Sequence, residues 1–115
     1  MNESIAEAYQ PVSSFEAKAL LEKETDLVLI DVREDYEYEF CRIEGAKHIP
    51  LSRLPECFES LSLIPEQPIL IYCHHGKRSA KAALYLSSKG FKNLFNLEGG
   101  IDAWSRDIDS LVPQY

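Results

Sequence analysis

Two short, uninterrupted apolar runs are the strongest constraint that this sequence places on its fold. The first lies between Asp26 and Asp31, and the second extends from Ile69 to Tyr72. Runs of this length that are rich in branched residues are typical of strands covered on both faces, as the strands of parallel sheets are. The segments 46–49 and 93–96 are weaker patterns of the same kind and predict two further short strands.

Helical patterns lie between and beyond these runs. Ser13 and Glu16 have the spacing of a capping box, which predicts a helix that runs to about Lys23. The apolar residues at helical spacing in this segment are Phe15, Ala19 and Leu20. Short helices are also expected over residues 54–61 and 101–106.

The most regular helical pattern follows the second apolar run. It begins at Ser79 or Ala80, continues to Lys89 and ends at Gly90, a residue suited to the left-handed position after a helix. Strand and helix patterns therefore alternate along the chain, which indicates an α/β domain layered around a mostly parallel sheet. In such sheets, ligands bind beyond the carboxyl ends of the strands.

Length and charge narrow the class of protein. A chain of 115 residues suits one domain with its own core. A net charge of −7 disfavours nucleic acid and anionic membranes as partners, because both are bound through basic surface. The apolar runs are far shorter than the roughly 20 residues that cross a bilayer. Residues 1–7 lack the basic and apolar pattern of a secretory leader.

The number and spacing of the cysteines indicate the redox state of the compartment in which the protein works. Cys41, Cys57 and Cys73 are odd in number and have no paired spacing. Such usage is typical of reduced thiols, so a cytoplasmic location is expected.

Cys73 begins a segment that is rich in reactive and charged side chains. The residues that follow it are His74, His75, Gly76, Lys77, Arg78 and Ser79. If this segment joins a strand to a helix, its amides and the helix N-terminus can stabilise an anion, and Lys77 and Arg78 favour a thiolate at Cys73. Gly76 permits a tight bend and the close approach of a bound group. Ser79 caps the helix or donates a hydrogen bond into the loop.

Cys73 has a simpler interpretation as a small buried residue at the end of a strand. A core cysteine does not need a glycine, two basic residues and a hydroxyl in the next six positions, so the segment favours a nucleophile. Cys41 and Cys57 lack such neighbours and are expected to be structural. A zinc site is disfavoured because adjacent residues rarely converge on one ion and His48 is distant in sequence. An acid or base role for the loop histidines stays open.

The chain resembles single-domain rhodanese-like sulfurtransferases, because four of its segments match motifs of that family and occur in the same order. The segments that carry the resemblance span about residues 10–106 and are 29–34, 43–50, 71–79 and 97–104. The resemblance implies a three-layer sandwich, with a central five-stranded parallel sheet and helices on both faces, as one domain over residues 1–115. One departure is Cys41-Arg42, where many family members have Gly-His.

The resemblance also implies a reaction. Cys73 would accept a sulfane sulfur from a small anionic donor such as thiosulfate, become a persulfide, and pass the sulfur to a thiophilic acceptor such as a thiol-bearing protein. Residues 74–79 would hold the persulfide, and no metal or cofactor would be required. Asp31 and Arg33 would be structural supports, and Trp104 would be a packing anchor.

Two other functions fit parts of the same pattern. Phosphatases and arsenate reductases of the cell-cycle phosphatase type also use a cysteine in an anion cradle, but their arginine stands six positions after the cysteine. Here Arg78 stands five positions after Cys73, and Ser79 occupies the sixth. A non-catalytic interaction module is the second alternative. Loss of the cysteine is the usual sign of such a module, and Cys73 is present.

Overall fold

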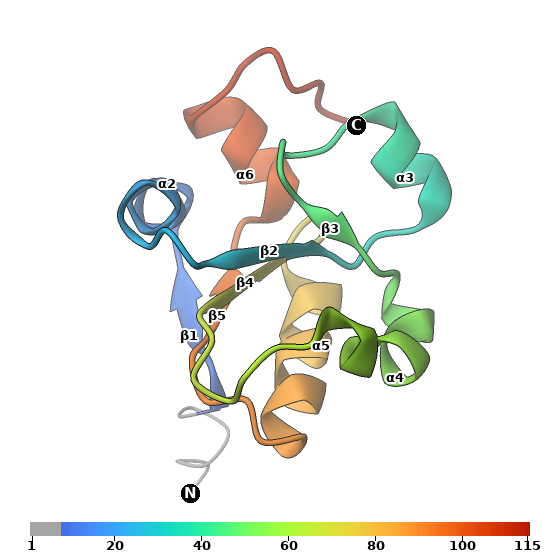
Figure 1. Ribbon diagram of the computed structural model, residues 1–115. Coiled ribbons are helices and arrows are strands. Elements are labelled where there is room, and N and C mark those ends of the chain that lie inside the picture. Colours follow the sequence, from blue (N-terminus) through green and yellow to red (C-terminus); the bar gives the residue numbers. More distant parts are fainter. Residues whose placement is uncertain (1–7) are drawn as a thin grey trace, which may run out of the picture.

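A five-stranded parallel sheet forms the centre of the computed structural model, which describes residues 8–115 (Figure 1). The strands are β1 (Gln10–Val12), β2 (Val28–Asp31), β3 (Lys47–His48), β4 (Ile69–Tyr72) and β5 (Leu94–Leu97), and their order is β1-β5-β4-β2-β3. The predicted five-stranded parallel sheet is therefore confirmed. The N-terminal residues without a leader pattern, 1–7, lie outside the described part.

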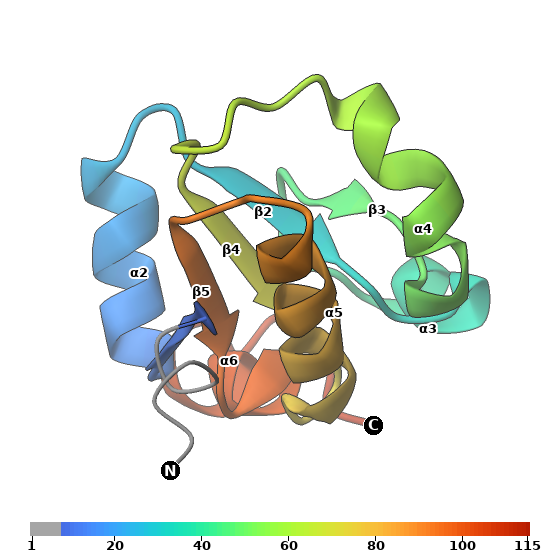
Figure 2. The same ribbon diagram turned by 90° about the horizontal axis from the view of Figure 1, so that it is seen from below.

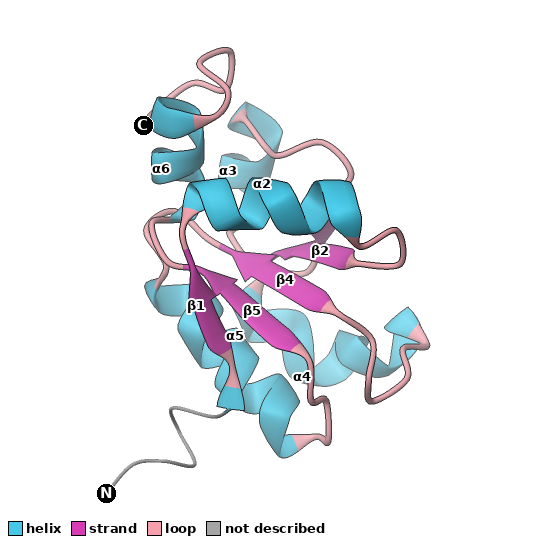
Figure 3. Ribbon diagram, turned by 90° about the vertical axis from the view of Figure 1, so that its left-hand side faces the viewer, coloured by secondary structure: helices cyan, strands magenta, loops and turns pink. Residues whose placement is uncertain are grey.

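Helices cover both faces of this sheet (Figure 3). The helical segments are α2 (Ser14–Lys23), α3 (Asp35–Phe40), η1 (Leu51–Arg53), α4 (Leu54–Cys57), η2 (Phe58–Leu61), α5 (Lys77–Ser88) and α6 (Gly100–Asp107). Helices α4 and α5 pack on one face, and α2 and α6 pack on the other. Figure 2 shows α5 beside β4 and β5 along much of its length. Within residues 8–115, every helix is too short or too polar to span a bilayer.

Strand β4 shows why the central strands are continuous apolar runs. Ile69 and Ile71 belong to the core layer under α5, whereas Leu70 and Tyr72 belong to the layer under α2 and α6. Successive side chains of a strand point to opposite faces, so a strand covered on both sides needs apolar residues at every position. Trp104 is 8% exposed in the second layer, which confirms its predicted burial.

Local signals for turns and caps were accurate. Ser13 accepts a hydrogen bond from the Glu16 amide at 3.1 Å, and Glu16 accepts one from the Ser13 amide at 2.8 Å. Gly90 has a φ of 98°, as expected after a helix. The predicted capping box and helix stop are both confirmed.

Several elements differ from the sequence-based expectations. Strand β1 and helix α3 were not predicted, because each is short and has no clear periodicity. In α2, Phe15 is 63% exposed and the helix buries Ser14 and Ala17 instead. The strand expected over 93–96 is displaced by one residue, and the segment expected as one helix over 54–61 divides into α4 and the 3₁₀ turn η2.

Candidate active site

Cys73 follows β4 directly and lies at the carboxyl edge of the sheet, where we expected the site. Its residue is 1% exposed, and its sulfur faces the layer under α5. The Gly76 amide donates a hydrogen bond to the sulfur at 3.1 Å, and the Ser79 amide donates one at 3.4 Å. Two amides of the loop and of the first helical turn therefore converge on one sulfur atom, an arrangement that favours negative charge there.

Helix α5 begins at Lys77, so the loop is shorter than the sequence indicated. Gly76 is the N-cap residue, and Ser79 lies inside the first turn. Of the two roles expected for Ser79, the one as helix cap is therefore wrong. Its hydroxyl lies 3.4 Å from the Cys73 sulfur instead, consistent with a contact inside the loop.

Gly76 is required by packing against the protein itself. It has a φ of 103°, and a Cβ at this position would stand 2.1 Å from the main-chain oxygen of Glu98. The positive φ confirms the tight bend expected at Gly76, and the glycine also permits a close approach of two main-chain segments, the loop after β4 and the turn after β5. Only glycine fits this conformation and this spacing without displacement.

The start of α6 holds the other side of the loop. Its Ile101 amide donates to the Cys73 carbonyl at 2.9 Å, and its Asp102 amide donates to the His74 carbonyl at 3.2 Å. Gly100 makes the approach possible, because a Cβ there would lie 2.1 Å from the His74 carbonyl oxygen. The loop carbonyls therefore bond to α6, while the amides of Gly76 and Ser79 turn toward the sulfur.

Asn96 is a buried polar residue of β5 that sequence reasoning missed. It accepts a hydrogen bond from the Ser79 hydroxyl at 2.5 Å and donates one to the Gly76 carbonyl at 3.2 Å. Both contacts fix groups that surround the Cys73 sulfur. The available signal was an amide side chain in an otherwise apolar strand, because buried polar groups need partners.

Asp31 ends β2 and forms a fully buried ion pair with Arg33. Asp31 accepts from Nη2 of Arg33 at 2.7 Å, from its Nε at 3.0 Å and from its main-chain amide at 3.0 Å. Asp31 thus pairs with a cation and also fixes the neighbouring backbone, contacts that suit a structural support. Burial disfavours the charge of Arg33, but hydrogen bonds to Asp31 and Tyr115 outweigh it and raise the pKa of Arg33.

Arg78 does not face the sulfur as a free charge. Its two terminal nitrogens donate to Glu37 of α3 at 2.6 and 2.9 Å. This bidentate pair raises the pKa of Arg78. Burial acts to raise the pKa of Glu37, but hydrogen bonds from Arg78, the Glu34 amide and Tyr115 outweigh it and hold that pKa at about 2.

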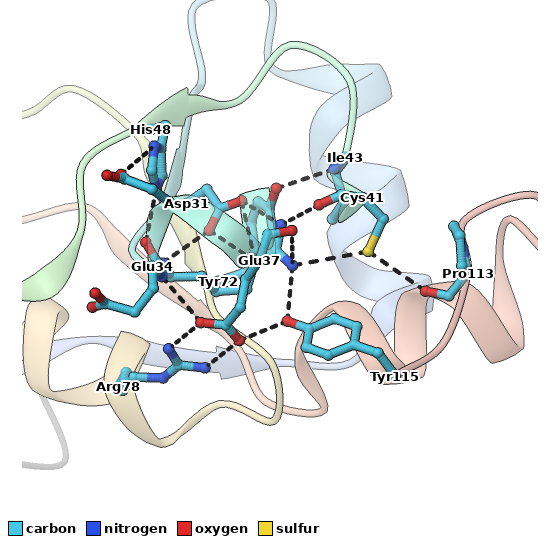
Figure 4. Close-up of polar contacts among 12 residues, drawn as sticks. Asp31, Glu34, Glu37, Cys41, Ile43, His48, Tyr72, Arg78, Pro113 and Tyr115 are labelled. Carbon is cyan, nitrogen blue, oxygen red and sulfur yellow. Dashed lines mark hydrogen bonds and ion pairs between the residues drawn. The ribbon is translucent and has the colours of Figure 1, made fainter. Parts of the chain in front are cut away.

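The Tyr115 hydroxyl connects these two pairs (Figure 4). It accepts from Arg33 at 2.8 Å and donates to Glu37 at 2.8 Å. Asp31, Arg33, Tyr115, Glu37 and Arg78 thus form one continuous set of contacts, the Arg33–Arg78 network. Sequence reasoning missed Glu37 and Tyr115, because nothing in their local patterns indicates that α3 and the segment after α6 meet the loop.

The loop histidines lie beside this network. The ring of His74 stacks between His75 and Tyr115, with centroid distances of 3.8 Å to each. His75 is 3.9 Å from the Asp102 carboxylate. Burial and the nearby His75 lower the pKa of His74.

One group of side chains has the composition of a metal site. Ligand atoms of His74, His75 and Asp102 lie within 4.8 Å of one another. The two imidazole planes are only 27° apart and stacked, so their lone pairs run side by side instead of converging. Asp102 also accepts a hydrogen bond from Gln114 at 3.1 Å. These three side chains would have to reorient before they could bind a metal ion.

A depression of about 460 Å³ opens beside Cys73. Its lining residues are Cys73, His74, His75, Lys77, Arg78 and Lys81. Every residue of the predicted loop except Gly76 and Ser79 lines it, and those two contact the sulfur from the buried side. The depression combines a thiol, imidazoles and positive charge, which suits a small anion.

The other two thiols lie away from this depression. The Cys41 sulfur lies 3.5 Å from the Pro113 carbonyl, to which it donates, and it belongs to the core layer under α2 and α6. Cys57 ends α4 and is half-buried. All three cysteines are free thiols.

Sequence comparisons show which known proteins this chain is similar to. The family model of the rhodanese-like domain matches residues 14–107. The thiosulfate sulfurtransferase GlpE of Coxiella burnetii is 38% identical over 96 residues, which cover 84% of this chain and 87% of that protein.

Two solved structures have a similar fold. A rhodanese-related protein of Thermoplasma volcanium has a TM-score of 0.73 and 32% identity, covering 87% of this chain and 94% of the other. A protein of unknown function from Rhodopseudomonas palustris, described as a possible tyrosine phosphatase, has a TM-score of 0.76 and 26% identity, covering 98% and 89%.

Proposed function

This chain belongs to the rhodanese-like domain family, and from that premise we propose that it is a sulfurtransferase that carries a sulfane sulfur on Cys73. The observation that supports the proposal most directly is the pair of amides, from Gly76 and Ser79, that donate to the Cys73 sulfur. Cys73 also lines an open, positively charged depression. A thiol in these surroundings is suited to act as a nucleophile.

The proposed reaction has two displacement steps. In the first, the Cys73 thiolate attacks the outer sulfur of thiosulfate, a sulfur–sulfur bond forms, and sulfite leaves with the electron pair of the broken bond. In the second, a nucleophilic acceptor such as cyanide or a protein thiolate attacks the outer sulfur of the persulfide, and the Cys73 thiolate leaves. The electrons balance in both steps without a redox partner, so this reaction requires no metal or organic cofactor.

The residues around Cys73 have separate roles in this proposal. The Gly76 and Ser79 amides stabilise negative charge on the sulfur. Lys77 and Lys81 are exposed at the rim of the depression and attract an anionic donor. Asn96 and α6 hold the loop in shape. Asp31 and Arg33 support the site from behind, and we propose that they do not take part in the chemistry.

We also propose that the protein works where thiols remain reduced, such as the cytoplasm. Its three cysteines are free, and the reaction consumes a thiolate. A small anionic sulfur donor and a thiol-bearing acceptor protein are the partners that this chemistry requires.

Intact-mass measurement after incubation with thiosulfate tests the proposal. We expect wild type to gain the mass of one sulfur atom and to form thiocyanate when cyanide is added. Cys73→Ser should show neither result, whereas the matched control Cys57→Ser should behave as wild type, because Cys57 lies in α4 outside the depression.

The same experiment separates the alternatives. Wild type that neither gains sulfur nor forms thiocyanate would indicate a binding module and overturn the proposal. Turnover of a phosphotyrosine substrate that depends on Cys73 would indicate a phosphatase. The spacing argues against that reaction, because Ser79 occupies the position of the phosphatase arginine and Arg78 is paired with Glu37.

A further inference from the structure

The segment that follows α6 returns across the molecule to α3 (Figure 1). It lies outside residues 14–107, the part that matches the family model. Several contacts fix its course: the Ser105 hydroxyl donates to the Val112 carbonyl, the Cys41 sulfur donates to the Pro113 carbonyl, and Gln114 donates to Asp102. Tyr115 is thereby brought to the edge of the candidate site.

The hydroxyl of Tyr115 lies between two charged pairs. It accepts from Arg33, which is paired with Asp31, and it donates to Glu37, which is paired with Arg78. One hydroxyl therefore satisfies a buried guanidinium and a buried carboxylate together. Without it, Nη1 of Arg33 keeps only longer contacts, to the Glu37 carbonyl at 3.3 Å and to the Cys41 sulfur at 3.9 Å.

The ring of Tyr115 covers His74, the residue next to the candidate nucleophile. The two rings are 3.8 Å apart and 5° from parallel. Phe40 contacts the ring of Tyr115 edge-on at 5.8 Å. The Nε2 atom of His74 is buried and has no hydrogen-bond partner within residues 8–115. An imidazole covered in this way is poorly placed to carry a proton and a positive charge.

We propose that Tyr115 is a positioning residue of the Cys73 site: its ring holds His74 in place in an uncharged form, and its hydroxyl ties Arg33 to the Glu37–Arg78 pair. The proposal rests on the proposed sulfur transfer and extends it to a residue outside the part of the chain that defines the family. Tyr115 acts through His74 and Glu37 and has no role in bond breaking.

The groups that face His74 agree with this role. His75 of the same loop and burial both lower the pKa of His74. Asp102 of α6, Glu37 of α3 and the main chain of Tyr115 act in the opposite direction, and their combined effect is smaller. Removing the ring of Tyr115 would hydrate His74, while the acidic neighbours would remain to favour its protonated form.

The test compares Tyr115→Leu with Tyr115→Phe. Phe keeps the stacked ring and removes the hydroxyl, whereas Leu removes both and keeps an apolar side chain. The first measurement is the titration of the His74 ring by NMR, which needs no sulfur donor. We expect His74 to titrate at higher pH in Tyr115→Leu than in wild type, and to titrate as in wild type in Tyr115→Phe.

The second measurement is the pH profile of Cys73 alkylation by iodoacetamide. A protonated His74 in Tyr115→Leu should raise the rate of Cys73 alkylation in the acidic part of this profile by about two- to fivefold. This is the size expected for one added charge near a partly hydrated thiolate. Tyr115→Phe should keep the wild-type profile and should melt at a lower temperature, because Arg33 loses an acceptor. Leu111→Ala is the control, since Leu111 is 90% exposed in the same segment.

An unchanged His74 titration in Tyr115→Leu would overturn the proposal. If that variant fails to fold, Tyr115→Phe still decides the role of the hydroxyl, because an unchanged melting temperature would contradict the link to Arg33. If His74 titrates at higher pH in Tyr115→Leu but wild type forms no persulfide, the positioning role of Tyr115 is supported and the proposed sulfur transfer is wrong.

Discussion

Glu37 accepts both terminal nitrogens of Arg78, at 2.6 and 2.9 Å, and this pair connects α3 to the first turn of α5. The charge of Arg78 is therefore balanced within the protein. We therefore propose that the exposed lysines at the rim of the depression, Lys77 and Lys81, attract the anionic donor.

The first prediction concerns these lysines. Lys81→Gln should raise the KM for thiosulfate by about two- to fivefold at low salt, because one charge about 4 Å away in water is worth about 1 kcal/mol. The effect should shrink at high salt, where exposed charges are screened. Steady-state kinetics at two ionic strengths measure it, with Lys89→Gln at the far end of α5 as the control. Equal effects of the two substitutions would contradict local attraction.

The second prediction concerns the three thiols. Iodoacetamide at slightly acid pH should label Cys73 before Cys41 and Cys57, because amides converge on the Cys73 sulfur. The thiol of Cys41 instead donates to the Pro113 carbonyl. Peptide mapping after brief labelling measures the order. Labelling of Cys57 ahead of Cys73 would show that exposure alone decides reactivity.

The third prediction concerns Gly76. Gly76→Ala should displace the loop, since the added Cβ would lie 2.1 Å from the Glu98 oxygen, and sulfur loading of Cys73 should be lost. Gly90→Ala is a matched control: its φ of 98° is similar, but its Cβ would meet nothing within 4 Å. Both variants should lose about 1–3 kcal/mol of stability from the left-handed backbone. Only Gly76→Ala should lose the intact-mass signal of the persulfide.

The fourth prediction concerns the buried pair. Asp31→Asn leaves the fully buried Arg33 without a charged partner and should lower the free energy of unfolding by about 3–5 kcal/mol. Lys18→Gln, which breaks an exposed pair with Glu22, should cost no more than about 0.5 kcal/mol. Urea denaturation of both variants provides the comparison. A similar, small loss of unfolding free energy in both variants would mean that water reaches Arg33.

The fifth prediction concerns pH. The pKa of Glu37 is lower in the folded protein, about 2, than the ordinary value of 4.5, so its ionised form stabilises the fold above about pH 4.5. That stabilisation is lost as the pH falls from about 4.5 through about 2. The difference in melting temperature between wild type and Glu37→Gln should therefore shrink over this interval. A constant difference would indicate that Glu37 contributes by shape alone.

Much of the fold could be read from local patterns. The apolar runs at β2 and β4 reflect strands covered on both faces, and the capping box at Ser13 and the glycine at position 90 mark helix ends. Each of these signals depends only on residues a few positions apart. Helix α3 and strand β1 were missed because they are too short for a period to emerge, and their stability comes from contacts with distant segments.

The sequence by itself determined which thiol ends a buried strand and that a glycine, basic residues and a serine follow it, because these features are adjacent along the chain. Only the tertiary structure decided which charges meet. Glu37, Asn96 and Tyr115 reach the loop from α3, from β5 and from the segment after α6. Their partners depend on the strand order and on the path of the chain around the sheet, and no local pattern encodes either.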